Sequence, residues 1–105
     1  MNNSRGYEVM YLLDPKYDEE GLEDKKDRLE SIVESENGEV ESMDDWGKKR
    51  LAYEIDGFTE GYYLLVKFEA ASDSIDGISE KSNVEEDVIK YQIFRRKDVA
   101  EPVKS

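Results

Sequence analysis

The sequence predicts a single α+β domain with the element order β-α-β-β-α-β, in which a four-stranded antiparallel sheet carries two helices on one face. Four apolar or alternating segments have the length and composition of strands, and two other segments have apolar residues at helical spacing. Turn-forming residues separate the segments, and right-handed crossovers place both helices on the same face. Of the 105 residues, 1–97 are expected to form this domain and 98–105 a flexible C-terminal tail.

The first predicted strand spans Tyr7–Leu13 and ends at Asp14-Pro15. Both of its faces are largely apolar, which is typical of a central strand in a sheet. One face carries Tyr7, Val9, Tyr11 and Leu13, and the other carries Glu8, Met10 and Leu12.

The first predicted helix runs from Asp18 to about Asn37. Asp18 suits the N-cap position, and the acidic residues that follow it favour the positive end of the helix dipole. Asn37-Gly38 is a stop signal. The apolar stripe, in which a lysine fills one turn, consists of Leu22, Lys25 or Lys26, Leu29, Ile32 and Val33.

Two strands occupy the middle of the chain. Glu39–Ile55 is long and polar, which suits an edge strand because charged side chains discourage edge-to-edge aggregation. Asp56-Gly57 and Glu60-Gly61 are expected to bracket a turn. Gly61–Glu69 is the most hydrophobic strand. By alternation, its core-facing residues are Tyr62, Leu64, Val66 and Phe68.

The last two predicted elements are a short helix and a strand. Ser72 or Asp73 is expected to cap the helix, which ends near Asn83. The strand runs from Val84 to about Arg96 and alternates apolar with polar or exposed residues. The complete order is the split β-α-β arrangement, also called ferredoxin-like, with the second and fourth strands at opposite edges.

The net charge of −12 is distributed unevenly along the chain. Residues 18–45 carry thirteen acidic and three basic residues, and residues 72–87 carry six acidic residues and one basic residue. The remaining segments are neutral or carry a net charge of +3. Because the acidic segments largely coincide with the predicted helices, we expect an acidic helical face and a neutral-to-basic sheet face.

The residue types argue against catalysis and metal binding. The chain has no Cys and no His, which removes thiolate chemistry and the commonest metal ligand. Its paired carboxylates lie in charged surroundings typical of a solvated face, and it has no phosphate loop, calcium loop or dinucleotide turn. We therefore expect no enzyme activity, cofactor or metal. The chain has neither a secretory signal nor the roughly 20-residue apolar run of a membrane span, so we expect a cytoplasmic location.

A basic triplet, Lys48-Lys49-Arg50, is the strongest candidate for contact with an anionic partner. Lysines also protect edge strands, so the triplet alone is a weak signal, and cations on the last strand strengthen it. The two groups would contact phosphates at separated points and fix orientation. Base stacking is not supported, because Gly61–Phe68 lacks the Gly-aromatic-small-aromatic order of small RNA-binding domains. Tyr63 and Phe94 are expected on the open sheet face, where exposed aromatic residues indicate a partner interface.

Three blocks carry a resemblance to a known family. The first block, Arg5–Pro15, reads Arg-Gly-Tyr-Glu-Val-Met-Tyr-Leu-Leu-Asp-Pro. The second block, Trp46–Ile55, reads Trp-Gly-Lys-Lys-Arg-Leu-Ala-Tyr-Glu-Ile. The third block is Gly61-Tyr62-Tyr63. They resemble the opening strand, the Gly-basic-basic-x-Leu-Ala-Tyr-x-Ile signature and the following strand of the bacterial small-subunit ribosomal protein S-six family. The match covers nearly the whole chain.

The resemblance implies a non-enzymatic, structural role in the small ribosomal subunit. It implies binding to small-subunit rRNA as a heterodimer with a smaller basic protein, ribosomal protein S-eighteen. With the cations of the last strand, the candidate rRNA contacts are Arg5, Lys48, Lys49, Arg50, Lys90, Arg95 and Arg96. The candidate partner contacts are Trp46, Tyr53, Tyr63, Tyr91 and Phe94.

The chain departs from the family pattern in its acidic first helix and in the acidic loop Asp56–Glu60. Both departures weaken independent RNA affinity and favour binding together with a basic partner, whose association electrostatic steering would accelerate. The alternative is a small regulatory or protein-interaction domain of the same fold that does not bind RNA. A carboxylate-based enzyme is a third and more distant alternative.

Overall fold

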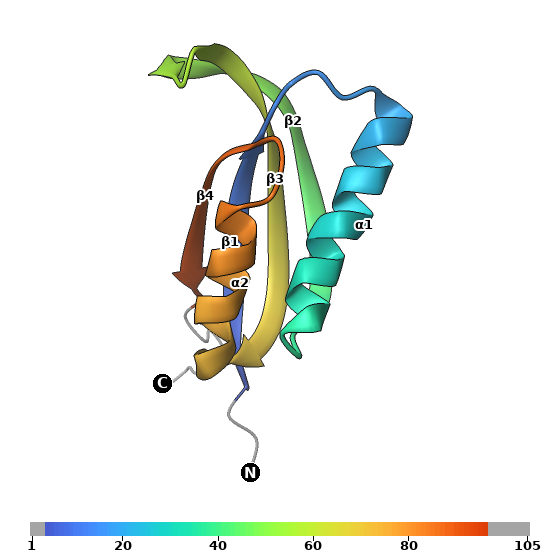
Figure 1. Ribbon diagram of the computed structural model, residues 1–105, viewed down its shortest axis with the longest axis vertical. Helices are drawn as coiled ribbons and strands as arrows, with labels where there is room; N and C mark the ends of the chain where they lie inside the picture. Colours follow the sequence, from blue (N-terminus) through green and yellow to red (C-terminus); the bar gives the residue numbers. More distant parts are fainter. Residues whose placement is uncertain (1–3, 97–105) are drawn as a thin grey trace, which may run out of the picture.

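The computed structural model describes residues 4–96, so the expected tail at 98–105 lies outside the described residues. Its elements are β1 (Ser4–Leu13), α1 (Glu19–Ser35), β2 (Glu39–Ile55), β3 (Phe58–Ala71), a 3-10 turn η1 (Ser72–Ser74), α2 (Ile75–Asn83) and β4 (Val88–Arg95). The strands form one antiparallel sheet in the order β2-β3-β1-β4, and both helices pack on one face of it (Figure 1). The predicted split β-α-β-β-α-β fold is confirmed. No described helix is long and apolar enough to cross a membrane.

The core lies between the sheet and the two helices. β1 is central, as predicted, and its helix-facing side chains are almost completely buried. α1 covers them with the predicted stripe, and Lys25 rather than Lys26 fills the missing turn, with 7% of its surface exposed. The largest buried contributions come from Val9, Tyr11, Leu13, Leu29, Val33, Leu64, Val66, Phe68 and Ile78.

The beginnings of the two helices differ in how they are capped. Asp18 caps α1 as predicted, because its carboxylate accepts a hydrogen bond from the Gly21 backbone N–H at 2.8 Å. The prediction that Ser72 or Asp73 caps the second helix is wrong. Both residues lie within η1, and α2 begins at Ile75 without a side-chain capping bond. The tighter 3-10 turn leads the chain directly into the helix, so a separate cap is not required.

Several strand boundaries also differ from the prediction: β1 begins three residues earlier, β3 is longer at both ends, and β4 begins later. The turn between β2 and β3 consists only of Asp56 and Gly57, whose φ angles are 48° and 84°, and Phe58 already belongs to β3. Two-residue turns with positive φ match the twist of antiparallel strands and therefore allow pairing up to the turn. β4 begins at Val88 rather than Val84, because residues 84–87 form a loop that is bonded to α1.

That loop is fixed by buried charges. Lys25 Nζ donates to Glu85 Oε2 at 2.6 Å and to the Glu86 carbonyl at 2.5 Å, and Arg28 Nε donates to Glu85 Oε1 at 3.0 Å. The Lys25 and Glu85 side chains are each 8% exposed. Burial by itself raises the pKa of Glu85. The hydrogen bonds and positive charges of Lys25 and Arg28 lower it by more, so the pKa lies below its ordinary value. The start of β4 is therefore positioned by α1.

Candidate nucleic-acid and partner interface

The face of the sheet opposite the helices is the open face, and strand register arranges its side chains in rows. The pairing of β1 with β3 and β4 gives the rows Leu12-Tyr63-Lys90, Met10-Leu65-Gln92 and Glu8-Lys67-Phe94. The rows become more apolar toward the end of the sheet where the hairpin turn of β2 and β3 lies. Leu12 and Leu65 of the two rows nearer the hairpin are buried, whereas Phe94 in the third row is 45% exposed.

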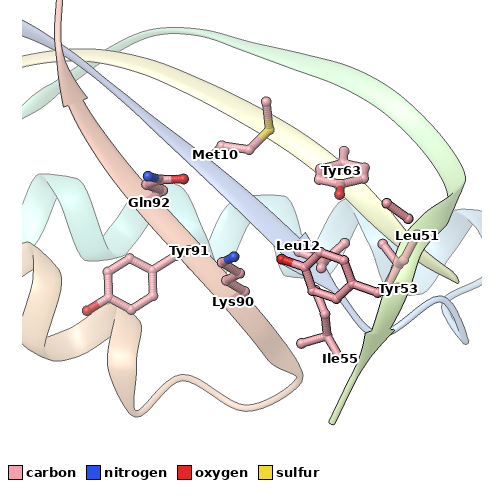
Figure 2. Close-up of a pocket in the computed structure, with 10 residues that line it drawn as sticks. Met10, Leu12, Leu51, Tyr53, Ile55, Tyr63, Lys90, Tyr91 and Gln92 are labelled. Carbon is pink, nitrogen blue, oxygen red and sulfur yellow. The ribbon is translucent and has the colours of Figure 1, made fainter. Parts of the chain in front are cut away.

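The β2–β3 hairpin extends beyond the rest of the sheet and curls over at its end (Figure 1). β1 pairs with β3 only as far as Tyr62, so the residues of β3 before Gly61 pair with β2 alone. Between the pairs Arg50↔Glu60 and Ile55↔Phe58, β2 has four residues and β3 has one. Extra residues on one strand bend it. The bend brings Leu51, Tyr53 and Ile55 close to Leu12 (Figure 2).

The curled hairpin and the sheet enclose a groove of about 270 Å³ (Figure 2). Its walls are mainly apolar and aromatic, and Lys90 and Gln92 of β4 provide a polar edge. The lining side chains on the hairpin side are Met10, Leu12, Leu51, Tyr53, Ile55 and Tyr63. Tyr53 is 67% exposed, so much of this apolar surface is available to a partner.

The cations divide into two groups according to their ion pairs. The described chain contains thirteen Lys and Arg residues, and seven of them lie within 4.0 Å of a carboxylate oxygen. Within residues 4–96, the six without such an ion pair are Arg5, Lys48, Lys49, Arg50, Lys90 and Arg95. All six are exposed, and all six belong to the predicted rRNA-contact set.

The six free cations lie at two ends of the sheet. Four of them lie at the hairpin end. The triplet Lys48-Lys49-Arg50 pairs with residues 60–62 of β3, and Lys90 pairs with Leu12. Arg5 and Arg95 lie at the opposite end of β1. Arg5 and Leu12 are seven positions apart along β1, which corresponds to roughly 23 Å at the strand rise per residue. The sequence groups these cations by strand, whereas the structure places Lys90 at the same end of the sheet as the triplet and Arg95 at the other end with Arg5.

Arg96, the seventh predicted cation, is partly buried and ion-paired, with 27% of its side chain exposed. Its Nη2 contacts Glu41 Oε1 at 2.9 Å, and its backbone N–H donates to the Gly6 carbonyl at 2.9 Å. The guanidinium lies over Gly6, where a Cβ atom would be only 2.8 Å from Nη2. Arg96 thus fastens the end of β4 across the sheet to β2, and we leave it out of the RNA-contact set.

The predicted partner residues are also divided. Trp46, Tyr53 and Phe94 are exposed, and Tyr63 lines the groove. Tyr91 also borders the groove, but its ring points toward α2 (Figure 2), and its hydroxyl donates to the Ser79 carbonyl of that helix at 3.0 Å. Its neighbours Lys90 and Gln92 face the groove, so alternation directs Tyr91 to the core. We therefore leave Tyr91 out of the partner surface.

Several groove residues were not among the predicted site residues. Met10 and Leu12 share one predicted face of the first strand, and Leu51 and Ile55 alternate with Ala52 and Glu54 along the second. Their alternation was the available signal, but the bend that joins them into one surface depends on the irregular pairing of β2 with β3.

Comparison with known proteins identifies the family. The family model described as Ribosomal protein S6 matches residues 6–95. The chain belongs to the ribosomal protein S6 family. This is the S-six family that the sequence blocks resembled, so the resemblance is confirmed. The S6 family is non-enzymatic, which agrees with the expected absence of enzyme activity.

Individual relatives agree with the family match. The small ribosomal subunit protein bS6 of Carboxydothermus hydrogenoformans is 38% identical over 91 residues, which cover 87% of this chain and 95% of the relative. That of Natranaerobius thermophilus is 38% identical over 94 residues, which cover 90% and 98%. The crystal structure of 30S ribosomal protein S6 from Thermotoga maritima superposes with a TM-score of 0.84 at 30% identity and covers 92% of each chain.

Proposed function

We propose that this S6-family chain binds small-subunit rRNA through its free cations and docks ribosomal protein S-eighteen on its open face. As a member of the family it is a structural constituent of the small ribosomal subunit, and its location is the cytoplasmic ribosome. The RNA and protein contacts are the finer steps of the proposal. Their mechanism is positioning, since phosphate contacts fix orientation without reading sequence.

The free cations carry the proposal. The chain has 27 acidic residues, and seven described cations are already paired with carboxylates. A carboxylate paired with a cation offsets its positive charge and repels a nearby phosphate, which costs binding free energy. The six free cations have no such cost, and neutralising phosphates releases condensed counterions from the RNA.

The groove supports the protein contact. Its apolar and aromatic walls suit the apolar side chains of a partner, and exposed apolar patches of this kind mark interaction sites. The net charge of −12 favours a basic partner, because opposite charges accelerate association and offset repulsion between the acidic chain and RNA. Lys90 lies at the edge of the groove and is also a free cation, so the two surfaces adjoin there.

The test compares two triple variants that remove the same amount of positive charge. In one, Lys48, Lys49 and Arg50 are replaced by Ala. In the control, the paired residues Lys16, Lys67 and Lys81 are replaced by Ala. Binding to small-subunit rRNA with ribosomal protein S-eighteen present is measured as a function of salt.

Each phosphate contact contributes roughly 0.7–0.9 to the slope of log K against log salt, so the first variant should reduce the slope by about two to three. The control should retain the wild-type slope. A wild-type slope for the triplet variant would show that the basic triplet does not contact phosphates, and a wild-type protein that binds no rRNA would favour a protein-interaction domain.

A further inference from the structure

β2 contains a one-residue bulge directly before the basic triplet. Asp45 pairs with Leu64, and Gly47 pairs with the adjacent residue Tyr63, so Trp46 is an additional residue on β2. Gly47 has a φ of 81°, a left-handed conformation that glycine adopts without steric cost. From this point on, the alternation of β2 is shifted by one position relative to β3.

The shift decides which face each later side chain occupies. Asp45 is opposite the core residue Leu64, so a regular strand would place Lys49 on the same helix-facing side. With the bulge, Lys48 and Arg50 take that side, and Lys49 takes the open face. Leu51, Tyr53 and Ile55 follow Lys49 and reach the groove. A one-residue slip would reverse all of these positions.

The carboxylate of Asp45 is bonded to both sides of the bulge. Its Oδ1 accepts a hydrogen bond from the Gly47 backbone N–H at 3.0 Å and another from the Tyr62 hydroxyl. Its Oδ2 accepts from Lys26 Nζ of α1 at 3.4 Å. The three donors come from β2, β3 and α1, so this carboxylate connects the bulge to the strand and helix beside it.

We propose that Asp45 is a positioning residue of the interface, which locks the bulge and thereby sets the faces on which the basic triplet and the groove residues are presented. The role in binding rests on the proposed function, whereas the role in register does not. Asp44 provides a contrast: it pairs opposite Leu65 on the open face, and its one ion pair among residues 4–96 is with Lys67, at 3.7 Å. Asp44 therefore has the same charge as Asp45 but no bond to the bulge.

Three variants that change the net charge equally test the proposal: Asp45→Ala, Asp45→Asn and Asp44→Ala. Cross-strand NOE contacts between Lys48 and Tyr62 report the register, and the fluorescence of Trp46, the only tryptophan, reports the bulge. Binding to small-subunit rRNA with ribosomal protein S-eighteen is measured at one salt concentration. Because each variant loses one negative charge, a general electrostatic effect cannot explain a difference in binding between them.

Asp45→Ala should lose the Lys48–Tyr62 contacts, shift the Trp46 emission and bind about tenfold more weakly than Asp44→Ala. Asp45→Asn should retain register and binding, because its amide oxygen can accept from Gly47 and Tyr62. Tyr62→Phe removes the hydroxyl that donates to Asp45 but keeps the ring that packs against the core. This variant should shift the Gly47 amide resonance, and it tests the proposal if Asp45→Ala does not fold.

Retention of the Lys48–Tyr62 contacts in Asp45→Ala, or an unchanged Gly47 resonance in Tyr62→Phe, would overturn the register role. Equal binding by Asp45→Ala and Asp44→Ala, with the register lost in the former, would overturn the positioning role in the interface. A wild-type protein that binds no rRNA would instead refute the proposed function, and the NOE contacts would still decide the register role.

Discussion

At the residue scale, buried polar groups in the core are matched in pairs. Tyr11 and Ser82 are both fully buried, and their hydroxyl oxygens are 2.6 Å apart. Burial raises the pKa of Tyr11 to about 12, so the phenol stays protonated and able to donate. Since neither group reaches water, each satisfies the other, and this bond connects β1 to α2.

Removing only one of the Tyr11 and Ser82 hydroxyl groups should therefore lower the stability by more than its share of the effect of removing both. We expect Ser82→Ala to lower the free energy of unfolding by about 1–3 kcal/mol, because it leaves the Tyr11 hydroxyl buried and unpaired. The double variant Tyr11→Phe/Ser82→Ala should be more stable than the sum of the single effects predicts. Urea unfolding measures all three variants, and Ser31→Ala on the exposed face of α1 is the control. Strictly additive effects would contradict this interpretation.

At the element scale, α1 determines the position of the loop before β4. Glu85 accepts bonds from Lys25 and Arg28 while its side chain is 8% exposed. Glu86, next in the chain, has an exposed side chain and contributes its backbone carbonyl. The connection is therefore specific to one carboxylate of an adjacent pair, which local sequence does not distinguish.

The ion pairs of Glu85 predict that the stability of the protein depends on pH. The folded pKa of Glu85 lies below its ordinary value of 4.5, so its contribution is fully present above that pH and is lost as the pH falls through the folded pKa. At pH 7, Glu85→Gln should lower the free energy of unfolding by about 3 kcal/mol, because it leaves the Lys25 charge buried without its carboxylate. The difference from wild type should shrink as the pH falls below about 4.5.

Glu86→Gln is the matched control for that prediction, because it removes the same charge from an exposed side chain. Its stability should stay within about 0.5 kcal/mol of wild type at neutral pH. Denaturant unfolding at several pH values measures both variants. A Glu85→Gln deficit that stays constant down to pH 2 would contradict the assigned ion pair.

At the scale of the whole molecule, acidic residues are concentrated on the exposed side of α1 and free cations on the sheet. Within α1 the exposed acids recur three or four residues apart, as in Glu19 and Glu23 or Glu20 and Asp24, which places like charges side by side. Repulsion of this kind destabilises the compact state and is screened by salt.

Salt should accordingly stabilise the free protein while it weakens RNA binding. The Debye length falls from about 30 Å at 0.01 M to about 8 Å at 0.15 M ionic strength. We expect the free energy of unfolding to rise by about 1 kcal/mol over this range, which corresponds to an increase in Tm of roughly 4–8 °C. Calorimetry in NaCl measures the shift. A Tm that falls with salt would show that exposed ion pairs outweigh the repulsion.

The sequence predicted the parts of this protein that depend on local pattern. Apolar periodicity and turn residues gave the element order, the central position of β1 and the edge position of β2, and Asp18 was recognised as a cap. Local pattern did not predict the η1 turn, because Ser72 and Asp73 are common capping residues but lie within that turn, or the start of β4, because that boundary depends on bonds to a distant helix. The Glu85 bonds to α1 are such a case.

The candidate site was predicted as a set of residue types and completed only by tertiary contacts. The sequence by itself determined the cations, the aromatic residues and the resemblance to the family, because these are properties of residues and their spacing. The tertiary structure decided that Arg96 is bound by Glu41, that Tyr91 faces the core, and that the curled hairpin forms a groove. It also decided the faces of the basic triplet, since a one-residue bulge between paired strands reverses the alternation that sequence alone suggests.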